Sequence, residues 1–302
     1  MKDFIKNVFA NIVAILLIGA VLLGIMIMIF VVSAMSGDQK PFVENNSVLT
    51  INFKGNILDS YTEKEESIFD FGQNKDVLLL DVVNAINNAK KDEKIKGISI
   101  EVDNLPAGIT QVDDIRASIE DFKKSGKFVY AYGNNMSQKS YYLASVADKV
   151  YLNPVGMIEL KGMSTEVTFL KDFAAKYGIG VDVIRHGKFK AAVEPFIRND
   201  ISPENKEQLS TLLNDIWGNI STKIKASRKL DDATFKTAVD SLYGFMPELV
   251  VKNKLADQLL QKSEYENLIK KQLKLKSDEK INRISVNKYI NALDEEESND
   301  NK

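Results

Sequence analysis

The sequence predicts an α/β domain built from βαβ units, preceded by one N-terminal transmembrane helix. Its composition is that of a folded globular protein, with 44% hydrophobic and 27% charged residues in a chain of 302. Residues 12–34 contain no ionisable side chain. The rest of the chain alternates between strand-like and helix-like patterns, which is typical of parallel βαβ units. Composition and the alternation of elements place the fold in the α/β class, and the segment at residues 12–34 predicts the transmembrane helix.

Composition also excludes several kinds of site. The 40 basic and 42 acidic residues give a net charge of −2, so we expect no nucleic-acid partner. The absence of cysteine excludes disulfides, thiolate catalysis and cysteine-based zinc sites, and a single histidine leaves little for metal binding. We therefore expect neither a metal nor a cofactor.

The N-terminal apolar segment is long enough to cross a bilayer. Residues 12–34 number 23, and a spanning helix needs about 20. A cleaved signal peptide is the alternative, with Val32 and Ala34 as a possible cleavage site. The apolar core of such a peptide covers only about 7–15 residues. We therefore predict a permanent anchor at residues 1–35.

The charges that flank this segment predict its orientation. Lys2 and Lys6 precede it, whereas Asp38 and Lys40 follow it. The positive-inside rule then favours a cytoplasmic N-terminus. We expect a single-pass protein of the inner (cytoplasmic) membrane, with its bulk outside the cytoplasm.

The elements expected after a polar tether at residues 36–46 alternate in type, as parallel crossovers require. The strands are expected at Val48–Phe53, Ile95–Val102, Phe128–Tyr132, Lys149–Asn153, Met157–Lys161 and Val181–Arg185. The helices are expected at Asp76–Lys91, from Thr110 to Gly126, near Ser137–Ala147, near Glu166–Tyr177, and from Ser202-Pro203 onwards.

Two of these helices have clear start signals. Thr110 with Asp113 three residues later resembles a capping box, and Gly126 is a stop signal. Pro203 suits the first position of the long helix. The apolar residues expected on the buried faces of these two helices are Val112, Ile115, Ile119, Phe122, Leu209, Leu212, Leu213, Ile216, Ile220 and Ile224.

The α/β domain is expected to cover residues 47–290. Smaller helices are expected to follow the long one, to about Leu275. Residues 291–302 are acidic and poor in apolar side chains, so we expect a tail there, or a linker to a further domain.

Two lysines are candidates for chemistry. Lys188 and Lys190 follow the strand expected at Val181–Arg185, and sites in α/β folds gather at the carboxyl ends of strands. Composition alone favours a solvated loop. The flanking residues 191–196, AAVEPF, are unusually apolar for such a loop, however, and burial lowers the pKa of a lysine. A neutral amine can act as a general base.

These residues also carry a resemblance to a known family. Residues 187–196, GKFKAAVEPF, followed by Arg198-Asn199-Asp200 and Ser202-Pro203, resemble signal peptide peptidase A, also called protease IV. A second spaced block, from Tyr132-Gly133-Asn134 to Asn153-Pro154, fits the same family. The order of anchor, strands and motifs is similar to the first half of the long, two-domain form.

The resemblance implies a crotonase-like or Clp-protease-like domain, and a serine endopeptidase with a Ser/Lys dyad in place of a histidine triad. It implies that Lys190 is the general base, that Lys188 is the competing candidate, and that the serine lies in a second domain. It further implies apolar peptide substrates such as cleaved signal peptides, a homo-oligomer, and a ring of domains.

The sequence departs from the family pattern at the nucleophile. Gln138 stands where the family's serine would stand, and an amide cannot attack a carbonyl. Ser137 and Ser140 are nearby, but their expected roles are helix capping and local hydrogen bonding. The turn at residues 104–108 lacks the doubled glycine of the family's oxyanion hole, so we expect no functional hole here. The single histidine, His186, is expected to be structural.

Three functional hypotheses remain open. In the first, the chain supplies the base, the anchor and the groove walls of a peptidase whose serine comes from another domain. In the second, it is a non-catalytic, membrane-tethered assembly module. In the third, it is an acyl-CoA enzyme, which a crotonase-like fold alone would permit.

Overall fold

The computed structural model describes residues 1–35, 42–53, 55–60, 76–184, 187 and 190–300. The chain divides into two compact units, Met1–Phe42 and Val43–Lys302, which are described separately below. Most of the tether predicted at residues 36–46 lies outside the described residues.

The first unit contains one helix, α1 (Lys2–Met35). Its 34 residues extend over about 51 Å at 1.5 Å per residue, which exceeds a hydrocarbon core of about 30 Å. Residues 2–29 are long and apolar enough to cross a membrane, and none of these side chains is buried. The predicted N-terminal helix is confirmed, whereas its permanence as an anchor stays a prediction.

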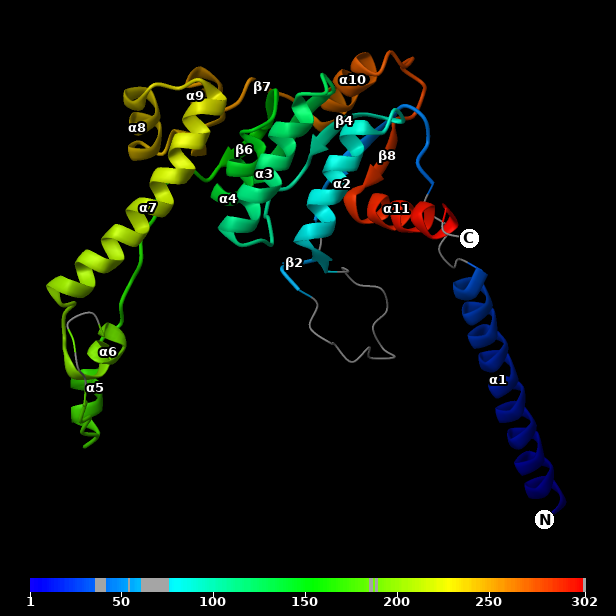
Figure 1. Ribbon diagram of the computed structural model, residues 1–302. Coiled ribbons are helices and arrows are strands. Elements are labelled where there is room, and N and C mark those ends of the chain that lie inside the picture. Colours follow the sequence, from blue (N-terminus) through cyan, green and yellow to red (C-terminus); the bar gives the residue numbers. More distant parts are fainter. Residues whose placement is uncertain (36–41, 54, 61–75, 185–186, 188–189, 301–302) are drawn as a thin grey trace. The chain divides into compact units, whose positions relative to one another are not determined.

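The second unit is organised around a six-stranded sheet of order β7-β6-β5-β4-β1-β8, in which all neighbours pair in parallel (Figure 1). The strands are β1 (Ser47–Ile51), β4 (Ile95–Ile100), β5 (Phe128–Met136), β6 (Lys149–Ile158), β7 (Gln258–Leu259) and β8 (Asn282–Ser285). A two-stranded sheet joins β2 (Ile57–Leu58) to β3 (Val77–Leu78). The predicted parallel α/β class is confirmed.

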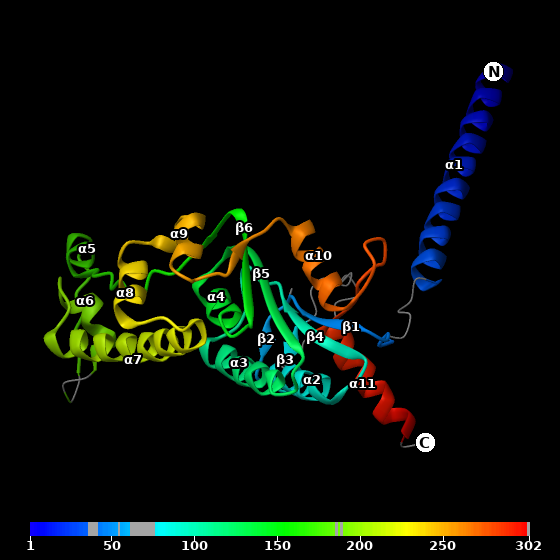
Figure 2. The ribbon, with the colours of Figure 1, turned by 90° about the horizontal axis from the view of Figure 1, so that it is seen from above.

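Helices cover both faces of the large sheet, as Figure 2 shows. On one face lie α2 (Leu79–Lys91), α3 (Ile109–Lys123), α4 (Gln138–Ala144) and α11 (Val286–Asp300). On the other face lies α10 (Lys262–Gln272), over a separate cluster that contains Val48, Phe128, Tyr132, Tyr151, Tyr265 and Ile269. Because both faces are covered, the strands read as apolar runs with few polar positions.

The remaining elements lie between β6 and α10 in the chain. They are α5 (Lys171–Lys176), the 3₁₀ helix η1 (Ala191–Val193), α6 (Glu194–Ile197), α7 (Pro203–Arg228), α8 (Asp232–Asp240), the 3₁₀ helix η2 (Tyr243–Phe245) and α9 (Pro247–Lys252). We call residues 163–202, which contain α5, η1 and α6, the lysine lobe.

Several predicted boundaries are wrong. The two strands expected at Lys149–Asn153 and Met157–Lys161 are one strand, β6. Its partner β5 runs beside it as far as Met136, pairing up to Leu152 and, after an irregularity, again at Met157 and Ile158. The helix expected near Glu166–Tyr177 is only the six residues of α5. Residues predicted as an acidic tail continue α11 as far as Asp300.

The strand predicted at Val181–Arg185 is also wrong for its described part. Residues 181–184 form no strand, and the Ile184 side chain is fully exposed, at 104%. A strand needs a neighbouring edge to satisfy its backbone groups, and among the described residues no strand pairs with residues 181–184. The described residues before Lys190 therefore do not form the predicted strand.

Helix α3 does not use the predicted cap. It begins at Ile109, and the backbone N–H of Gly108 donates to Gln111 Oε1 at 2.8 Å. Asp113 serves a different purpose: it accepts hydrogen bonds from the Tyr142 hydroxyl, from Asn219 Nδ2 at 2.8 Å and from Lys223 Nζ at 2.8 Å. Burial opposes ionisation of Asp113, but these hydrogen bonds hold its pKa below the usual value.

The apolar stripe of α7 is buried only in its C-terminal half. Ile220 and Ile224 are buried, whereas Leu209 and Leu213 are partly exposed and Leu212 is 54% exposed. The prediction of a fully buried face was therefore wrong for the first half of the helix within a single chain.

Candidate functional site

Lys190 lies in the lysine lobe, immediately before η1. Its side chain is exposed, so the burial expected from the apolar flank does not occur in the single chain. The flanking residues Ala191 and Val193 are only partly buried. The competing lysine, Lys188, and the single histidine, His186, lie outside the described residues.

A buried carboxylate fastens the turn that carries Lys190 to the start of α7. Glu194 is only 1% exposed, and its Oε2 accepts from the Ser202 backbone N–H at 3.3 Å and from Asn205 Nδ2 at 3.1 Å. Hydrogen bonds from Ser202, and then from Asn205, hold the pKa of Glu194 below its usual value. Ser202 in turn caps α7 by accepting from the Asn205 backbone N–H at 3.2 Å. Lys190 thus lies four residues before Glu194, which is hydrogen-bonded to the start of α7.

Sequence reasoning missed this attachment, although a signal was present. Glu194 is the only charged residue within the apolar run AAVEPF, and a carboxylate in such a run requires hydrogen-bond donors nearby.

Replacing Glu194 by alanine is expected to loosen the lysine lobe and to leave the sheet intact. The variant leaves the Ser202 backbone N–H and the Asn205 amide without their carboxylate acceptor. We expect trypsin to cleave within residues 163–202 at least about fivefold faster, measured by mass spectrometry of timed digests.

Glu204→Ala is the matched control. Glu204 lies in the first turn of α7, next to Asn205, and its side chain is not buried. Equal cleavage rates for both variants would show that Glu194 does not hold the lobe.

The start of α4 contains Ser137, Gln138 and Ser140, and Gln138 is the residue that the family resemblance matches to a serine. Ser137 is the N-cap of α4, and its Oγ accepts from the Ser140 backbone N–H at 3.3 Å. The two hydroxyl oxygens lie 2.9 Å apart, and Ser140 is buried. The predicted capping role is confirmed. Between them, Gln138 directs its amide to the backbone of Lys161 and Gly162.

Two N–H groups of the turn at residues 104–108 donate to acceptors within the fold. The Ala107 N–H donates to Leu105 O at 2.9 Å, and the Gly108 N–H donates to Gln111 Oε1. Lys139 Nζ donates to the Ala107 carbonyl at 2.6 Å. An oxyanion hole needs N–H groups that are directed at the reacting oxygen. The expectation that this turn is no oxyanion hole stays a prediction.

The structure does not bring Lys190 to the start of α4. The lysine lobe is fastened at Asn205, whereas Ile216 and Ile220 of the same helix border Gln138. Eleven helical positions separate Asn205 from Ile216, which is about 16 Å. Figure 1 shows α6 and α4 near different ends of α7. The fold thus places Lys190 and the start of α4 at different parts of α7.

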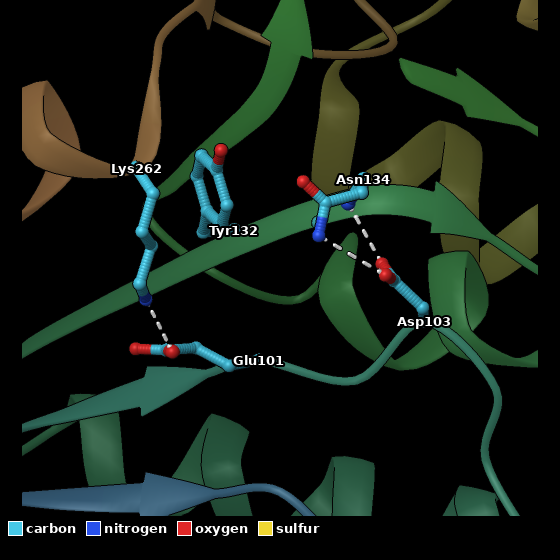
Figure 3. Close-up of a pocket in the computed structure, with 6 residues that line it drawn as sticks. Glu101, Asp103, Tyr132, Asn134 and Lys262 are labelled. Carbon is cyan, nitrogen blue, oxygen red and sulfur yellow. Dashed lines mark hydrogen bonds and ion pairs between the residues drawn. The ribbon is translucent and has the colours of Figure 1, made fainter.

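A polar cavity of about 270 Å³ lies at the carboxyl ends of β4 and β5 (Figure 3). Lys262 Nζ lies 2.5 Å from Glu101 Oε2, and Asp103 accepts the Asn134 backbone N–H at 2.7 Å. Burial opposes ionisation of Glu101, but Arg283 and the hydrogen bond from Lys262 keep its pKa below the usual value. These groups satisfy one another and hold α10 to the sheet, so we assign the cavity a structural role.

Comparison with known proteins identifies the protein family of this chain. The profile of peptidase family S49 matches residues 121–276. The chain is 33% identical to Protease 4 of Haemophilus influenzae over 71% of this chain and 36% of that protein. It is 31% identical to the chloroplastic serine protease SPPA of Arabidopsis thaliana over 82% of this chain and 35% of that protein. The chain thus spans about a third of the length of these relatives.

Solved structures with similar folds include a mutant of the 1510-N membrane-bound stomatin-specific protease and a putative enoyl-CoA hydratase/isomerase from Acinetobacter baumannii. The first has a TM-score of 0.42 and 11% identity, and covers 80% of this chain and 97% of that chain. The second has a TM-score of 0.36 and 7% identity, and covers 74% of this chain and 76% of that chain.

Proposed function

Because this chain belongs to peptidase family S49, we propose that it is the lysine-bearing, membrane-anchored part of a serine endopeptidase. In this proposal Lys190 is the general base that takes the proton of a serine, and a second domain supplies that serine. Residues 1–35 are the anchor, residues 47–290 form the lysine-bearing domain, and residues 291–302 lead towards the second domain.

One contrast within the chain carries this proposal. The Lys190 turn is held by the buried Glu194, whereas the start of α4 has Gln138 in place of a nucleophile. In the turn at residues 104–108, the Ala107 and Gly108 N–H groups are hydrogen-bonded within the fold. A fastened lysine turn in a chain that has an amide at the family's serine position fits one partner of a shared site.

Exposed apolar side chains support association with further domains. The lysine lobe and the first half of α7 expose Phe173, Tyr177, Ile179, Ile184, Phe196 and Leu212. We propose that a homo-oligomer and the second domain cover this surface. Such burial would also remove water from Lys190.

The proposed position of this chain at the membrane suggests its substrate. We propose that α1 crosses the inner (cytoplasmic) membrane with a cytoplasmic N-terminus, so that the α/β domain lies outside the cytoplasm. The peptidase would then degrade apolar peptides, such as signal-peptide remnants, as they leave the bilayer.

The proposal predicts that the 302-residue chain alone cleaves nothing. We expect no hydrolysis of a fluorogenic leucine- and alanine-rich peptide by the purified chain in detergent micelles. A complete enzyme, in which the chain is joined to a serine-bearing S49 domain, should hydrolyse the peptide. Hydrolysis by the chain alone that survives replacement of Lys190 would refute the proposal.

The second candidate function is a non-catalytic, membrane-tethered assembly module. Hydrogen bonds within the fold favour this candidate. The Gln138 amide donates to the Gly162 carbonyl, and the Gly108 N–H of the 104–108 turn donates to Gln111, so both groups have structural roles. A complete enzyme with unchanged activity after Lys190 replacement would support this alternative.

A further inference from the structure

The strands of the large sheet all run in the same direction, so their first residues lie along one edge, which we call the amino edge. The ends of helices α2 and α10 reach this edge. Lys127, which precedes β5, donates from Nζ to the carbonyls of Ala89 at 2.8 Å and Asp92 at 2.7 Å, at the end of α2. Asn46, which precedes β1, donates from Nδ2 to the Leu273 carbonyl at 3.4 Å, at the end of α10.

Lysine is concentrated in the segments that reach the amino edge. Residues 90–96 and 270–280 contain the ends of α2 and α10, and residues 121–127 lead from α3 into β5. Together these segments contain twelve lysines and five acidic residues, although the whole chain has a net charge of −2. At the opposite edge, β4 is followed by Glu101 and Asp103. Charge is therefore distributed unevenly between the two edges of the sheet.

Stabilisation of helix ends explains only part of this excess. A cation in the last turn of a helix is favoured by the helix dipole. Lys90 lies in such a turn, and its Nζ is 2.7 Å from Asp121 Oδ2. Lys124 Nζ lies 3.2 Å from the other oxygen of the same carboxylate, but the Lys124 side chain is 75% exposed. An ion pair this exposed contributes little to stability, so Lys124 needs a further explanation.

Exposed lysines continue along the amino edge on both sides of the sheet. We call the following exposed residues the basic rim: Lys91, Lys96, Lys124, Lys271, Lys274 and Lys280. They come from the end of α2, the start of β4, the turn after α3, the end of α10 and the segment that follows α10. Because α2 and α10 lie on opposite faces of the sheet (Figure 2), the basic rim is a surface and not a single helix end.

The chain enters the α/β unit at the same edge. Val43 is buried, and Ser47 is the first residue of β1. Residues 36–42 separate Val43 from Met35, the last residue of α1. Seven residues extend over at most about 25 Å. The amino edge is therefore joined to the helix that could cross a membrane by a short connection.

We propose that the basic rim binds the phosphate groups of anionic phospholipids, so that the α/β unit rests on the bilayer with its amino edge. Binding of this kind rests on the proposed membrane-crossing role of α1, because the short connection then keeps the rim near the headgroups. An ammonium group is a point charge that attracts phosphate, and several lysines near an anionic surface act together. Salt screens this attraction over about 10 Å at 0.1 M ionic strength.

The test uses the full 302-residue chain in lipid nanodiscs. The chain contains no cysteine, so a single introduced cysteine can be labelled with a fluorescent donor. Asn88→Cys places the donor at an exposed position in the last turn of α2, next to the basic rim. Energy transfer to rhodamine-labelled headgroups is compared between phosphatidylcholine discs and discs in which about 30% of the lipid is phosphatidylglycerol.

Transfer from the Asn88→Cys label is expected to rise at least about 1.5-fold in the discs that contain phosphatidylglycerol. The rise should disappear at about 1 M salt, where the Debye length is about 3 Å. The matched label is Asn104→Cys, at an exposed position four residues beyond the end of β4. This position lies at the opposite edge, so its transfer should not rise. An equal rise at both labels would overturn the assignment of the amino edge.

Charge reversal identifies the groups responsible. Lys91→Glu, Lys124→Glu and Lys271→Glu, combined in the Asn88→Cys chain, should abolish the rise. The control reverses the same number of charges at exposed lysines of the lysine lobe and the first half of α7, and should keep the rise. The control positions are Lys171, Lys176 and Lys206. Should thermal melting show that the rim variant is unfolded, the corresponding triple glutamine variant decides, and it should lose at least about half of the rise.

Equal transfer in the two kinds of disc would overturn the proposal, and so would a rise that survives reversal of the rim charges. Retention of the chain on phosphatidylcholine discs during gel filtration tests the anchor by itself. None of these measurements depends on peptidase activity, so failure of the basic rim and failure of the proposed function are distinguishable.

Discussion

Replacement of Lys190 by alanine in a complete, serine-bearing enzyme is expected to lower kcat/KM by about 10³-fold or more. The lysine amine would be the only group that takes the serine's proton, and loss of a base that acts as a unit with its nucleophile removes most of the chemical acceleration. The measurement is steady-state hydrolysis of a fluorogenic apolar peptide, together with the oligomeric state by gel filtration.

Two control variants make this result specific. Lys188→Ala tests the competing lysine and should retain activity. Lys171→Ala replaces an exposed lysine of the same lobe and should change neither activity nor assembly. A fully active Lys190→Ala enzyme, or an inactive one that no longer assembles, would contradict the assignment of Lys190 as the base.

Replacement of Arg116 by methionine is expected to destabilise the α/β unit by about 3–5 kcal/mol, because it removes a buried cation that several acceptors share. The Arg116 side chain is 1% exposed. Its Nη1 donates to the Tyr142 carbonyl and to Ser145 Oγ at 2.8 Å. Its Nη2 donates to Ser227 Oγ and to the Lys223 carbonyl at 3.2 Å. The arginine thereby joins α3 to α4 and to the C-terminal half of α7.

Urea unfolding of the full chain in micelles checks this value. The single tryptophan, Trp217, stacks on Phe235 with ring centroids 5.9 Å apart, so its fluorescence reports the packing of α7 against α8. Glu120→Gln is the control. The Glu120 side chain is 53% exposed, and its Oε1 lies 3.6 Å from Arg116 Nε. An exposed ion pair of this kind is worth at most about 1 kcal/mol. Equal losses for the two variants would show that Arg116 has no special role.

Arg116 and Asp113 together determine how α7 is held. Asp113 binds Asn219 and Lys223, and Arg116 binds Ser227 and the Lys223 carbonyl. All these contacts lie in the C-terminal half of α7, which is also the half whose apolar face is buried. The first half of α7 therefore extends away with the lysine lobe, in the region where the apolar side chains remain exposed.

The parts of the fold that could be predicted from sequence have strong local signals. The apolar run of residues 12–34 predicted a helix, and the buried strands at Ile95–Ile100 and Phe128–Met136 read as apolar runs because helices cover both faces of a parallel sheet. Ser202-Pro203 correctly marked the start of α7. Such signals depend only on a residue and its neighbours along the chain, so they can be read from the sequence.

The predictions that failed depend on partners far away in the chain. Whether residues 181–184 form a strand depends on a free sheet edge, and whether β6 continues past Asn153 depends on how far β5 runs beside it. Thr110 and Asp113 have the spacing of a cap, yet Asp113 is bound by Lys223, 110 residues away. Local spacing cannot reveal such a competitor.

The sequence by itself determined the N-terminal helix and the α/β class, and its family resemblance pointed to Lys190 as the base and to Gln138 at the serine position. Only the tertiary structure decided that Glu194 fastens the Lys190 turn to α7, and that Gln138 bonds to Lys161 and Gly162. The reason is physical: residue type fixes which chemistry a side chain can perform, whereas its hydrogen-bond partners depend on which distant backbone groups the fold leaves unpaired.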